Sequence, residues 1–114
     1  MRLSEVLSRL EAEEICPATD YDVEVRNVCA SDMLSDILAT NKSDYVILTG
    51  LTTAQIVRTA EISEAIAIIL VRGKVPPADT AKFARDRGIP LSRSRFPMFE
   101  ACLRLGDLKQ EPSA

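Results

Sequence analysis

The stretch that decides the fold runs from Tyr45 to Lys74 and reads YVILTGLTTAQIVRTAEISEAIAIILVRGK. It contains two continuous apolar runs, at residues 46–48 and 65–71, and each run leads into a turn with a glycine. Residues 53–63 between the two runs have the spacing of a helix. Continuous rather than alternating apolar residues are typical of strands buried on both faces of a parallel sheet. The stretch therefore predicts a strand–helix–strand unit at the centre of an α/β domain.

The rest of the chain supplies elements that cover this sheet. Periodicity and turn residues predict helices at residues 3–10, 31–40, 77–87 and 97–105, and strands at residues 22–28 and 89–91. Pro90 donates no ladder hydrogen bond, so the last strand is expected near an edge. Together these elements predict a compact three-layer α/β/α fold with a mostly parallel central sheet. We expect one domain over residues 1–110 and a frayed tail at residues 111–114.

Apolar residues at helical spacing assign a buried side to the expected helices at residues 31–40 and 97–105. In the helix that follows Ser31, the apolar stripe consists of Met33, Leu34, Ile37 and Leu38. In the helix that Pro97 opens, the stripe consists of Met98, Phe99, Cys102 and Leu103. Each set follows the spacing with which a helix packs on a sheet.

Composition excludes several classes of protein. The 114 residues are 46% hydrophobic and 27% charged, as in soluble globular proteins, and the net charge of −3 argues against nucleic-acid binding. There is no His, and the three Cys form no CxxC motif, so we expect neither a metal site nor a disulfide framework, and no cofactor. No apolar run is long enough to span a membrane, and the acidic amphipathic start is no signal peptide. We therefore expect a cytoplasmic protein without a membrane partner.

Charge is unevenly spread along the chain. Residues 1–64 hold 12 acids and 5 bases, a net charge of −7, whereas residues 65–114 hold 5 acids and 9 bases, a net charge of +4. The basic half is either a solvated face or an edge that binds an anion or a partner.

In open α/β sheets, ligands bind beyond the carboxyl ends of the parallel strands. Three turns, at residues 49–52, 72–74 and 92–95, are expected at that edge, with N–H groups, hydroxyls and cations that suit a phosphate or carboxylate. The candidate ligand-binding residues are Gly50, Thr52, Arg72, Gly73, Lys74 and Arg93. The alternative is that the two glycines only permit tight turns, since neither turn is a P-loop or a GxGxxG loop.

Three other residues have two interpretations each. Cys29 lies between a strand and a helix start, where a helix dipole stabilises a thiolate, but packing as a small apolar side chain is the simpler interpretation. Asp32 and Asp36 lie one helical turn apart and form either an acidic pair for a metal or part of a solvated helix face.

Five segments carry a family resemblance. They are SDMLSDIL at residues 31–38, ILTGL at 47–51, QIVRTAE at 55–61, GIPL at 88–91 and FPMFEA at 96–101. This pattern, which covers about Arg2 to Leu105, resembles the DRTGG domain, most closely its small stand-alone members. It is also similar to the N-terminal domain of HPr kinase/phosphorylase and to the middle domain of long phosphate acetyltransferases.

The resemblance implies a compact α/β/α layer fold that tends to dimerise. It also implies a regulatory or assembly role, and it provides no catalytic residues. The chain departs from the family motif at two turns. Where many members have Gly-Asp-Arg, this chain has Gly50-Leu51-Thr52, and where many have Thr-Gly-Gly, it has Val71-Arg72-Gly73. HPr kinase activity is not implied, because the sequence contains no P-loop.

These observations favour one function and leave one alternative. The favoured function is a non-catalytic regulatory domain that senses a small anion or nucleotide, as a homodimer or with a partner enzyme. The alternative is a pure protein–protein interaction or scaffold domain without a small-molecule ligand. A sensor requires the basic turns to converge, whereas a scaffold does not. We expect no enzyme activity, because His, a P-loop and a metal-ligand cluster are all missing from the sequence.

Overall fold

The computed structural model describes residues 1–108. The expected tail at residues 111–114 and the last two residues of the expected domain lie outside this range. In chain order the elements are α1 (Leu3–Arg9), β1 (Glu13–Cys16), β2 (Asn27–Ala30), α2 (Leu34–Leu38), β3 (Tyr45–Thr49), α3 (Ala54–Ile62), β4 (Ala67–Leu70), α4 (Ala78–Arg87), β5 (Leu91–Arg93) and α5 (Met98–Arg104).

The described strands form one five-stranded sheet in the order β1-β5-β4-β3-β2. β2, β3, β4 and β5 are parallel to one another, while β1 pairs antiparallel with β5. The predicted strand–helix–strand unit is β3–α3–β4, and its two strands lie inside the sheet, as expected. Because four strands are parallel, their carboxyl ends meet at one edge of the sheet, which we call the carboxyl edge.

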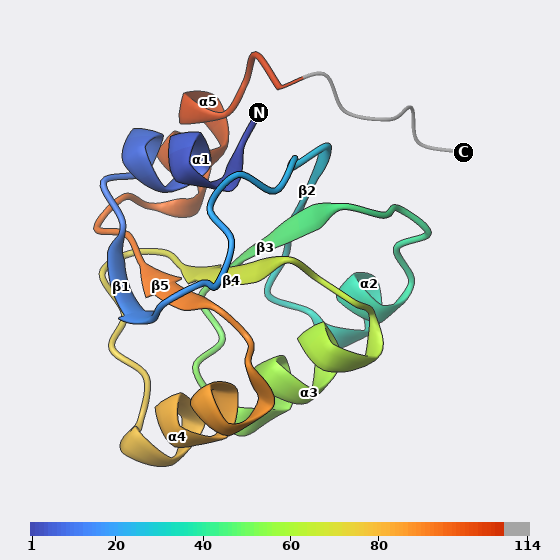
Figure 1. Ribbon diagram of the computed structural model, residues 1–114, viewed down its shortest axis with the longest axis vertical. Coiled ribbons are helices and arrows are strands. Elements are labelled where there is room, and N and C mark those ends of the chain that lie inside the picture. Colours follow the sequence, from blue (N-terminus) through green and yellow to red (C-terminus); the bar gives the residue numbers. More distant parts are fainter. Residues whose placement is uncertain (109–114) are drawn as a thin grey trace.

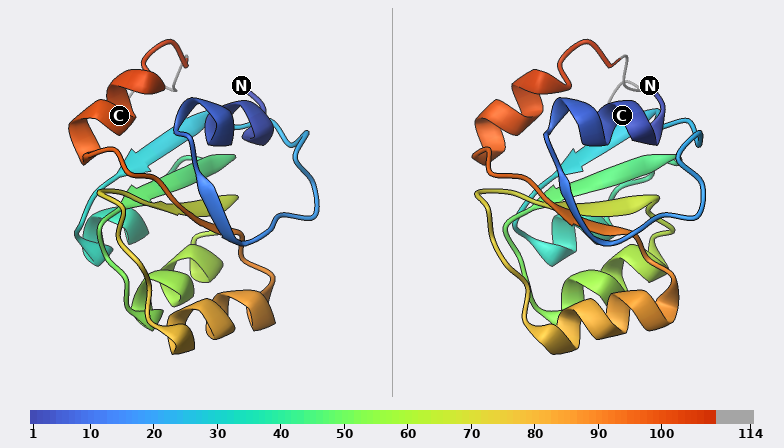
Figure 2. Two further views of the ribbon diagram at one scale, coloured as in Figure 1. Left: turned by 90° about the vertical axis from the view of Figure 1, so that its left-hand side faces the viewer. Right: turned by 60° about the vertical axis from the view of Figure 1, so that its left-hand side comes forward.

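Helices cover both faces of the sheet. α1 and α5 lie over one face, and α2, α3 and α4 lie over the other (Figures 1 and 2). The three-layer α/β/α architecture expected from the sequence is therefore confirmed. Within residues 1–108, no helix is both long enough and apolar enough to cross a membrane.

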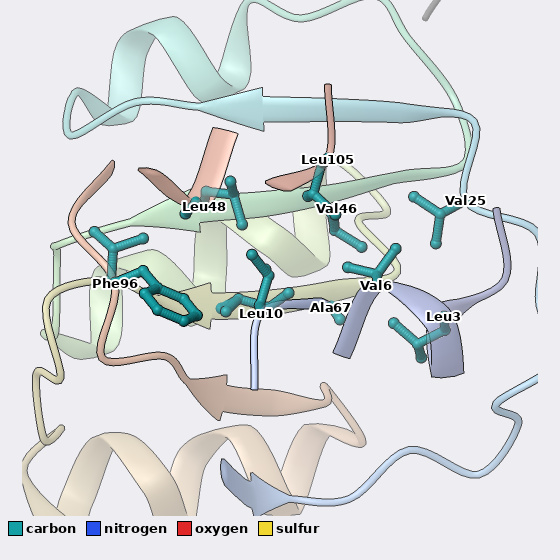
Figure 3. Packing of buried hydrophobic residues seen from close by; sticks show 12 residues of the cluster. Leu3, Val6, Leu10, Val25, Val46, Leu48, Ala67, Phe96 and Leu105 are labelled. Atoms are coloured by element: carbon teal, nitrogen blue, oxygen red, sulfur yellow. The ribbon is translucent and has the colours of Figure 1, made fainter. Parts of the chain in front are cut away.

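Two apolar clusters, one on each face of the sheet, form the core. Val46 and Leu48 of β3 pack into the cluster beneath α1 and α5, while Tyr45 and Ile47 pack into the cluster against α2, α3 and α4. Figure 3 shows the side chains of Leu3 and Val6 on α1, and of Leu10 directly after it, within the first of these clusters. Burial on both faces explains why the central strands are continuously apolar, and it stabilises the fold by about 25 cal/mol per Å² of apolar surface.

The strands at the margins differ from expectation. β2 is confined to Asn27–Ala30, later than the predicted residues 22–28, and β1 was not predicted because its sequence, EEIC, shows no alternation. β5 lies near the edge of the sheet, as expected, but it is not the outermost strand, because β1 pairs with it on its outer side. Pro90 is compatible with this position because it lies just before β5, where its carbonyl accepts a hydrogen bond from the N–H of Ile68 at 2.9 Å.

The buried side of α5 is also shifted from the predicted one. Phe99 and Leu103 are 75% and 62% exposed, whereas Ala101 and Leu105 are buried. The buried and half-buried positions 98, 101, 102 and 105 follow the helical spacing i, i+3, i+4, i+7. The prediction had positions 98 and 102 right, but it placed Phe99 and Leu103 on the buried side in place of Ala101 and Leu105.

α2 is shorter than predicted and covers less of the sheet. It spans five residues instead of ten, and of its expected stripe Ile37 is fully buried while Met33 and Leu38 are 58% and 48% exposed. A helix this short presents little more than one turn to the sheet, so few of its side chains are buried.

Candidate functional site

The turn after β4 has an unusual backbone. Arg72 and Gly73 have φ values of +60° and +63°, as at the two central positions of a type I′ turn, and the N–H of Lys74 donates to the carbonyl of Val71 at 3.3 Å. Gly73 therefore has the conformational role that the sequence suggested for it. Arg72 is a residue with a side chain in a conformation that favours glycine, which costs about 1–3 kcal/mol.

The backbone N–H groups of this turn are already used within the fold. The N–H of Arg72 donates to the carbonyl of Phe96 at 2.8 Å, and the N–H of Gly73 donates to the carbonyl of Ser94 at 2.7 Å. These bonds tie the turn to the segment after β5. An anion at this turn would therefore be bound by side chains rather than by these two amides.

Gly50 follows β3, and its φ lies outside the left-handed region, so its turn does not require glycine. Its N–H donates to Oδ1 of Asp32 at 2.7 Å. A Cβ added at Gly50 would lie 3.4 Å from that oxygen and 3.6 Å from Nη2 of Arg72. Gly50 and Arg72, two of the predicted site residues, are therefore neighbours at the carboxyl edge.

Asp32 connects these two residues, although sequence reasoning did not assign it to the site. It lies in the loop between β2 and α2, so it does not share a helix with Asp36 as the sequence suggested. Its Oδ1 also lies 3.3 Å from the hydroxyl of buried Thr49, and its Oδ2 lies 3.6 Å from Nη2 of Arg72. Its place just after a parallel strand was the available signal, because such positions meet at the carboxyl edge.

Asp32, Thr49, Gly50 and Arg72 form what we call the Asp32 cluster, and Arg93 points away from it. Its Nε donates to Oε2 of Glu13 on β1 at 3.3 Å, and its Nη1 donates to the carbonyl of Gly73 at 3.3 Å. Arg72 reaches toward the β2 side of the edge, whereas Arg93 reaches toward the β1 side. The two guanidinium groups therefore do not converge on a common point through their side chains.

Two predicted residues remain without a direct contact to the Asp32 cluster. The Lys74 side chain is exposed and has no acidic partner within residues 1–108, and Thr52 is half-buried after Gly50. Both follow strands that end at the carboxyl edge. They are available to a ligand but are not organised by the fold around one atom position.

The uneven charge along the sequence is largely resolved by pairing between the two halves of the chain. Basic residues of the second half bind acids of the first half in the pairs Arg72–Asp32, Arg87–Glu61, Arg93–Glu13, Arg95–Glu11 and Arg104–Glu11. Exposed pairs of this kind contribute about 0–1 kcal/mol each to stability. The basic half is thus neither a bare cationic face nor a fully preformed anion site.

The three cysteines are free thiols, of which Cys16 is buried and Cys29 and Cys102 are half-buried. Burial raises the pKa of the Cys16, Cys29 and Cys102 thiols above the ordinary value. Cys29 lies within β2 rather than at a helix start, and loss of hydration raises the pKa of its thiol, so packing as a small apolar side chain is the favoured interpretation. Among the described residues, no three His, Cys, Asp or Glu side chains are grouped to hold a metal ion.

Two surface hollows lie on either side of β2. One, of about 310 Å³, lies between β2 and α5 and is lined by Val28, Ala30, Cys102, Leu105, Gly106 and Leu108. The other, of about 320 Å³, lies between β2 and α2. Among residues 1–108 the lining of the first hollow carries no charged side chain, so this part of it suits an apolar group rather than an anion.

Comparison with known proteins relates the fold to a regulatory domain. No protein-family model matches the sequence, and no curated protein has significant similarity to it. Among solved structures, the chain is similar to the CBS and DRTGG domains of the regulatory region of Clostridium perfringens pyrophosphatase, complexed with its activator, diadenosine tetraphosphate. The TM-score is 0.76 at 17% identity, over 91% of this chain and 45% of that chain. This chain thus spans less than half of its neighbour, and it has a DRTGG-related fold.

Proposed function

We propose that this chain is a non-catalytic regulatory domain that senses a small phosphate-bearing ligand at the carboxyl edge of its sheet. The observation that carries the proposal is the position of Arg72. Its guanidinium group lies beside Gly50, and its side chain is 54% exposed, so an anion from solvent has access to it. Arginine is well suited to this role because its planar fork of N–H donors matches the oxygens of a phosphate group.

Backbone strain supports a functional role for Arg72. Its positive φ costs about 1–3 kcal/mol, while an exposed ion pair such as Arg72–Asp32 contributes about 0–1 kcal/mol, so the pair does not offset the strain. Glu11, Asp44 and Glu64 also have positive φ, but they lie before strands or after helices at other places in the chain. Of the non-glycine residues with positive φ in the described part of the chain, only Arg72 directly follows a parallel strand at the carboxyl edge.

The structural neighbour supports the same class of function. That protein is described as a regulatory region with a nucleotide activator. A comparable role here is a proposal, in which the chain transmits ligand binding to a partner enzyme or to a second copy of itself. We propose no catalytic role, because the carboxylate of Asp32 at this edge is paired with Arg72 and the sequence has no His to act as a general base.

A thermal-shift experiment tests the proposal. Inorganic pyrophosphate and diadenosine tetraphosphate are titrated into the protein and into Arg72→Asn, which removes the charge and retains a residue that tolerates positive φ. Specific binding raises the melting temperature of the unmodified chain, because a ligand at a hundredfold excess over Kd adds about 2.7 kcal/mol to the free energy of unfolding. The Arg72→Asn protein should lose this response.

The chain offers a matched control for this experiment. Arg26 and Asp44 form an exposed pair at 3.5 Å at the opposite edge of the sheet, close to the 3.6 Å of Arg72 and Asp32. Arg26→Asn should therefore leave the ligand response unchanged. A response to neither compound, or equal loss in both variants, contradicts the proposal.

One observation favours the alternative of an interaction or scaffold domain. Arg72 and Arg93 are paired with acids on different sides of the carboxyl edge, so the predicted basic turns converge only in part. In addition, α5 exposes Phe99 and Leu103. If phosphate-bearing compounds leave the melting temperature unchanged while the exposed side of α5 mediates association, the scaffold function is the better account.

A further inference from the structure

The carboxylate of Asp32 has the surroundings that a bound phosphate group would have. Its Oδ1 accepts a hydrogen bond from the Gly50 N–H at 2.7 Å and lies 3.3 Å from the hydroxyl of Thr49, which is fully buried. Nη2 of Arg72 lies 3.6 Å from Oδ2. A backbone N–H, a hydroxyl and a guanidinium group are the donors with which proteins bind anions.

We propose that Asp32 is a built-in competitor of the ligand. In this account the free chain binds its own carboxylate, and a ligand's phosphate group gains Arg72 and the Gly50 N–H by displacing Asp32. The inference rests on the proposed function and adds a requirement on the ligand. Because Asp32 is tethered to the site, its effective concentration is on the order of millimolar or higher, so a weakly charged anion competes poorly. A ligand with two or more linked phosphate groups, such as a pyrophosphate or polyphosphate, meets this requirement.

Asp32 is placed so that it can leave. Its side chain is 47% exposed, and its pair with Arg72 is open to water, so screening keeps the attraction weak. It does not hold α2 in place, since the residue that caps the amino end of that helix is Met33 and no side chain caps it by a hydrogen bond. The Asp32 side chain can therefore turn toward solvent without ending α2.

Isothermal titration with sodium pyrophosphate tests the competition. Asp32→Asn keeps a side-chain oxygen for the Gly50 N–H but removes the negative charge opposite Arg72. We expect this variant to bind pyrophosphate about fivefold more tightly, the upper range for loss of one exposed ion pair. Asp44→Asn removes the same charge at the opposite edge of the sheet, and its affinity should stay within about twofold of the unmodified chain.

The outcomes separate this inference from the proposed function. If the unmodified chain binds pyrophosphate through Arg72 while Asp32→Asn binds equally or more weakly, Asp32 is not a competitor and the proposed function stands. If neither protein binds, both fail. Binding by the unmodified chain together with tighter binding by Asp32→Asn supports both.

A measurement on the unmodified chain does not depend on the folding of a variant. The carbon-13 signal of the Asp32 carboxyl should shift as pyrophosphate saturates the protein, because the carboxylate loses the Gly50 N–H and the guanidinium group. A signal that stays in place while binding proceeds overturns the competition.

Discussion

At the scale of single residues, Arg72 combines backbone strain with an exposed charge. Its φ of +60° is one that glycine adopts at no steric cost, and Gly73 beside it has nearly the same value. A residue retained against this cost is a candidate for function rather than for stability.

Arg72→Gly separates these two roles. Relief of strain and the greater freedom of glycine in the unfolded chain act in opposite directions, so the free energy of unfolding should stay the same or rise by up to about 1 kcal/mol. Stabilisation by pyrophosphate should disappear. Urea unfolding with and without pyrophosphate measures both effects, and a loss of more than about 1 kcal/mol in the absence of ligand would make Arg72 a structural residue.

The buried thiols predict how stability depends on pH. Burial raises the pKa of Cys16, Cys29 and Cys102 above the unfolded value of 9.0, and burial also raises the pKa of Tyr45 above 10.0. Such groups contribute stability that is fully present below the unfolded pKa and is lost as pH rises through the folded pKa. Thermal melts should therefore give a constant melting temperature up to about pH 8 and a falling one above pH 9.

A variant without thiols provides the control for the pH dependence. When all three cysteines are replaced by alanine, the decline should begin about one pH unit higher, where Tyr45 ionises. The same onset with and without the cysteines would mean that other groups cause the alkaline loss.

At the scale of elements, the central unit was predictable and the margins were not. β3 and β4 are each buried on both faces, so a continuous apolar run of a few residues is enough to predict each strand. β1 and β5 have four and three residues, and their neighbours are determined by long-range pairing that no local pattern contains. Asp32 and Arg72 are separated by two strands in sequence and meet only because β2, β3 and β4 are adjacent in the sheet. The site was therefore predictable as an edge, but not as a cluster around Asp32.

Two matched substitutions test the placement of the elements. Ile69 lies inside β4 and is fully buried, so Ile69→Ala should lower the free energy of unfolding by about 2–5 kcal/mol. Ile62 at the end of α3 is 72% exposed, so Ile62→Ala should change it by less than about 0.5 kcal/mol. Chemical denaturation measures both free energies, and a large loss for Ile62→Ala would contradict the placement of α3.

At the scale of the whole molecule, the exposed side of α5 is the surface that we propose for homodimer formation. Phe99 and Leu103 lie on the same side of α5 as Cys102, which lines the hollow between β2 and α5. A stable dimer buries roughly 800 Å² on each copy, about an eighth of the 6285 Å² surface of this chain. The exposed apolar side chains of Phe99 and Leu103 with an adjacent hollow suit a second copy, because the same surface can serve both partners.

Light scattering tests the dimer. The unmodified chain should have a mass of about twice 12.5 kDa, and Phe99→Glu should reduce it to that of the monomer. Ile62→Glu is the control, because Ile62 is 72% exposed on α3, on the other face of the sheet. A mass of 12.5 kDa for the unmodified chain across a wide concentration range would contradict the proposal.

The central claim is that the carboxyl edge around Arg72 binds a phosphate-bearing ligand, and a nitrogen-15 chemical-shift titration with pyrophosphate tests it most directly. The account predicts saturable shifts that are largest at the Gly50 amide, which loses its bond to Asp32, and at Arg72 and Lys74, with small shifts at Arg26 on the opposite edge. An absence of saturable shifts, or shifts that are centred on Arg26 or spread over the whole surface, would contradict it.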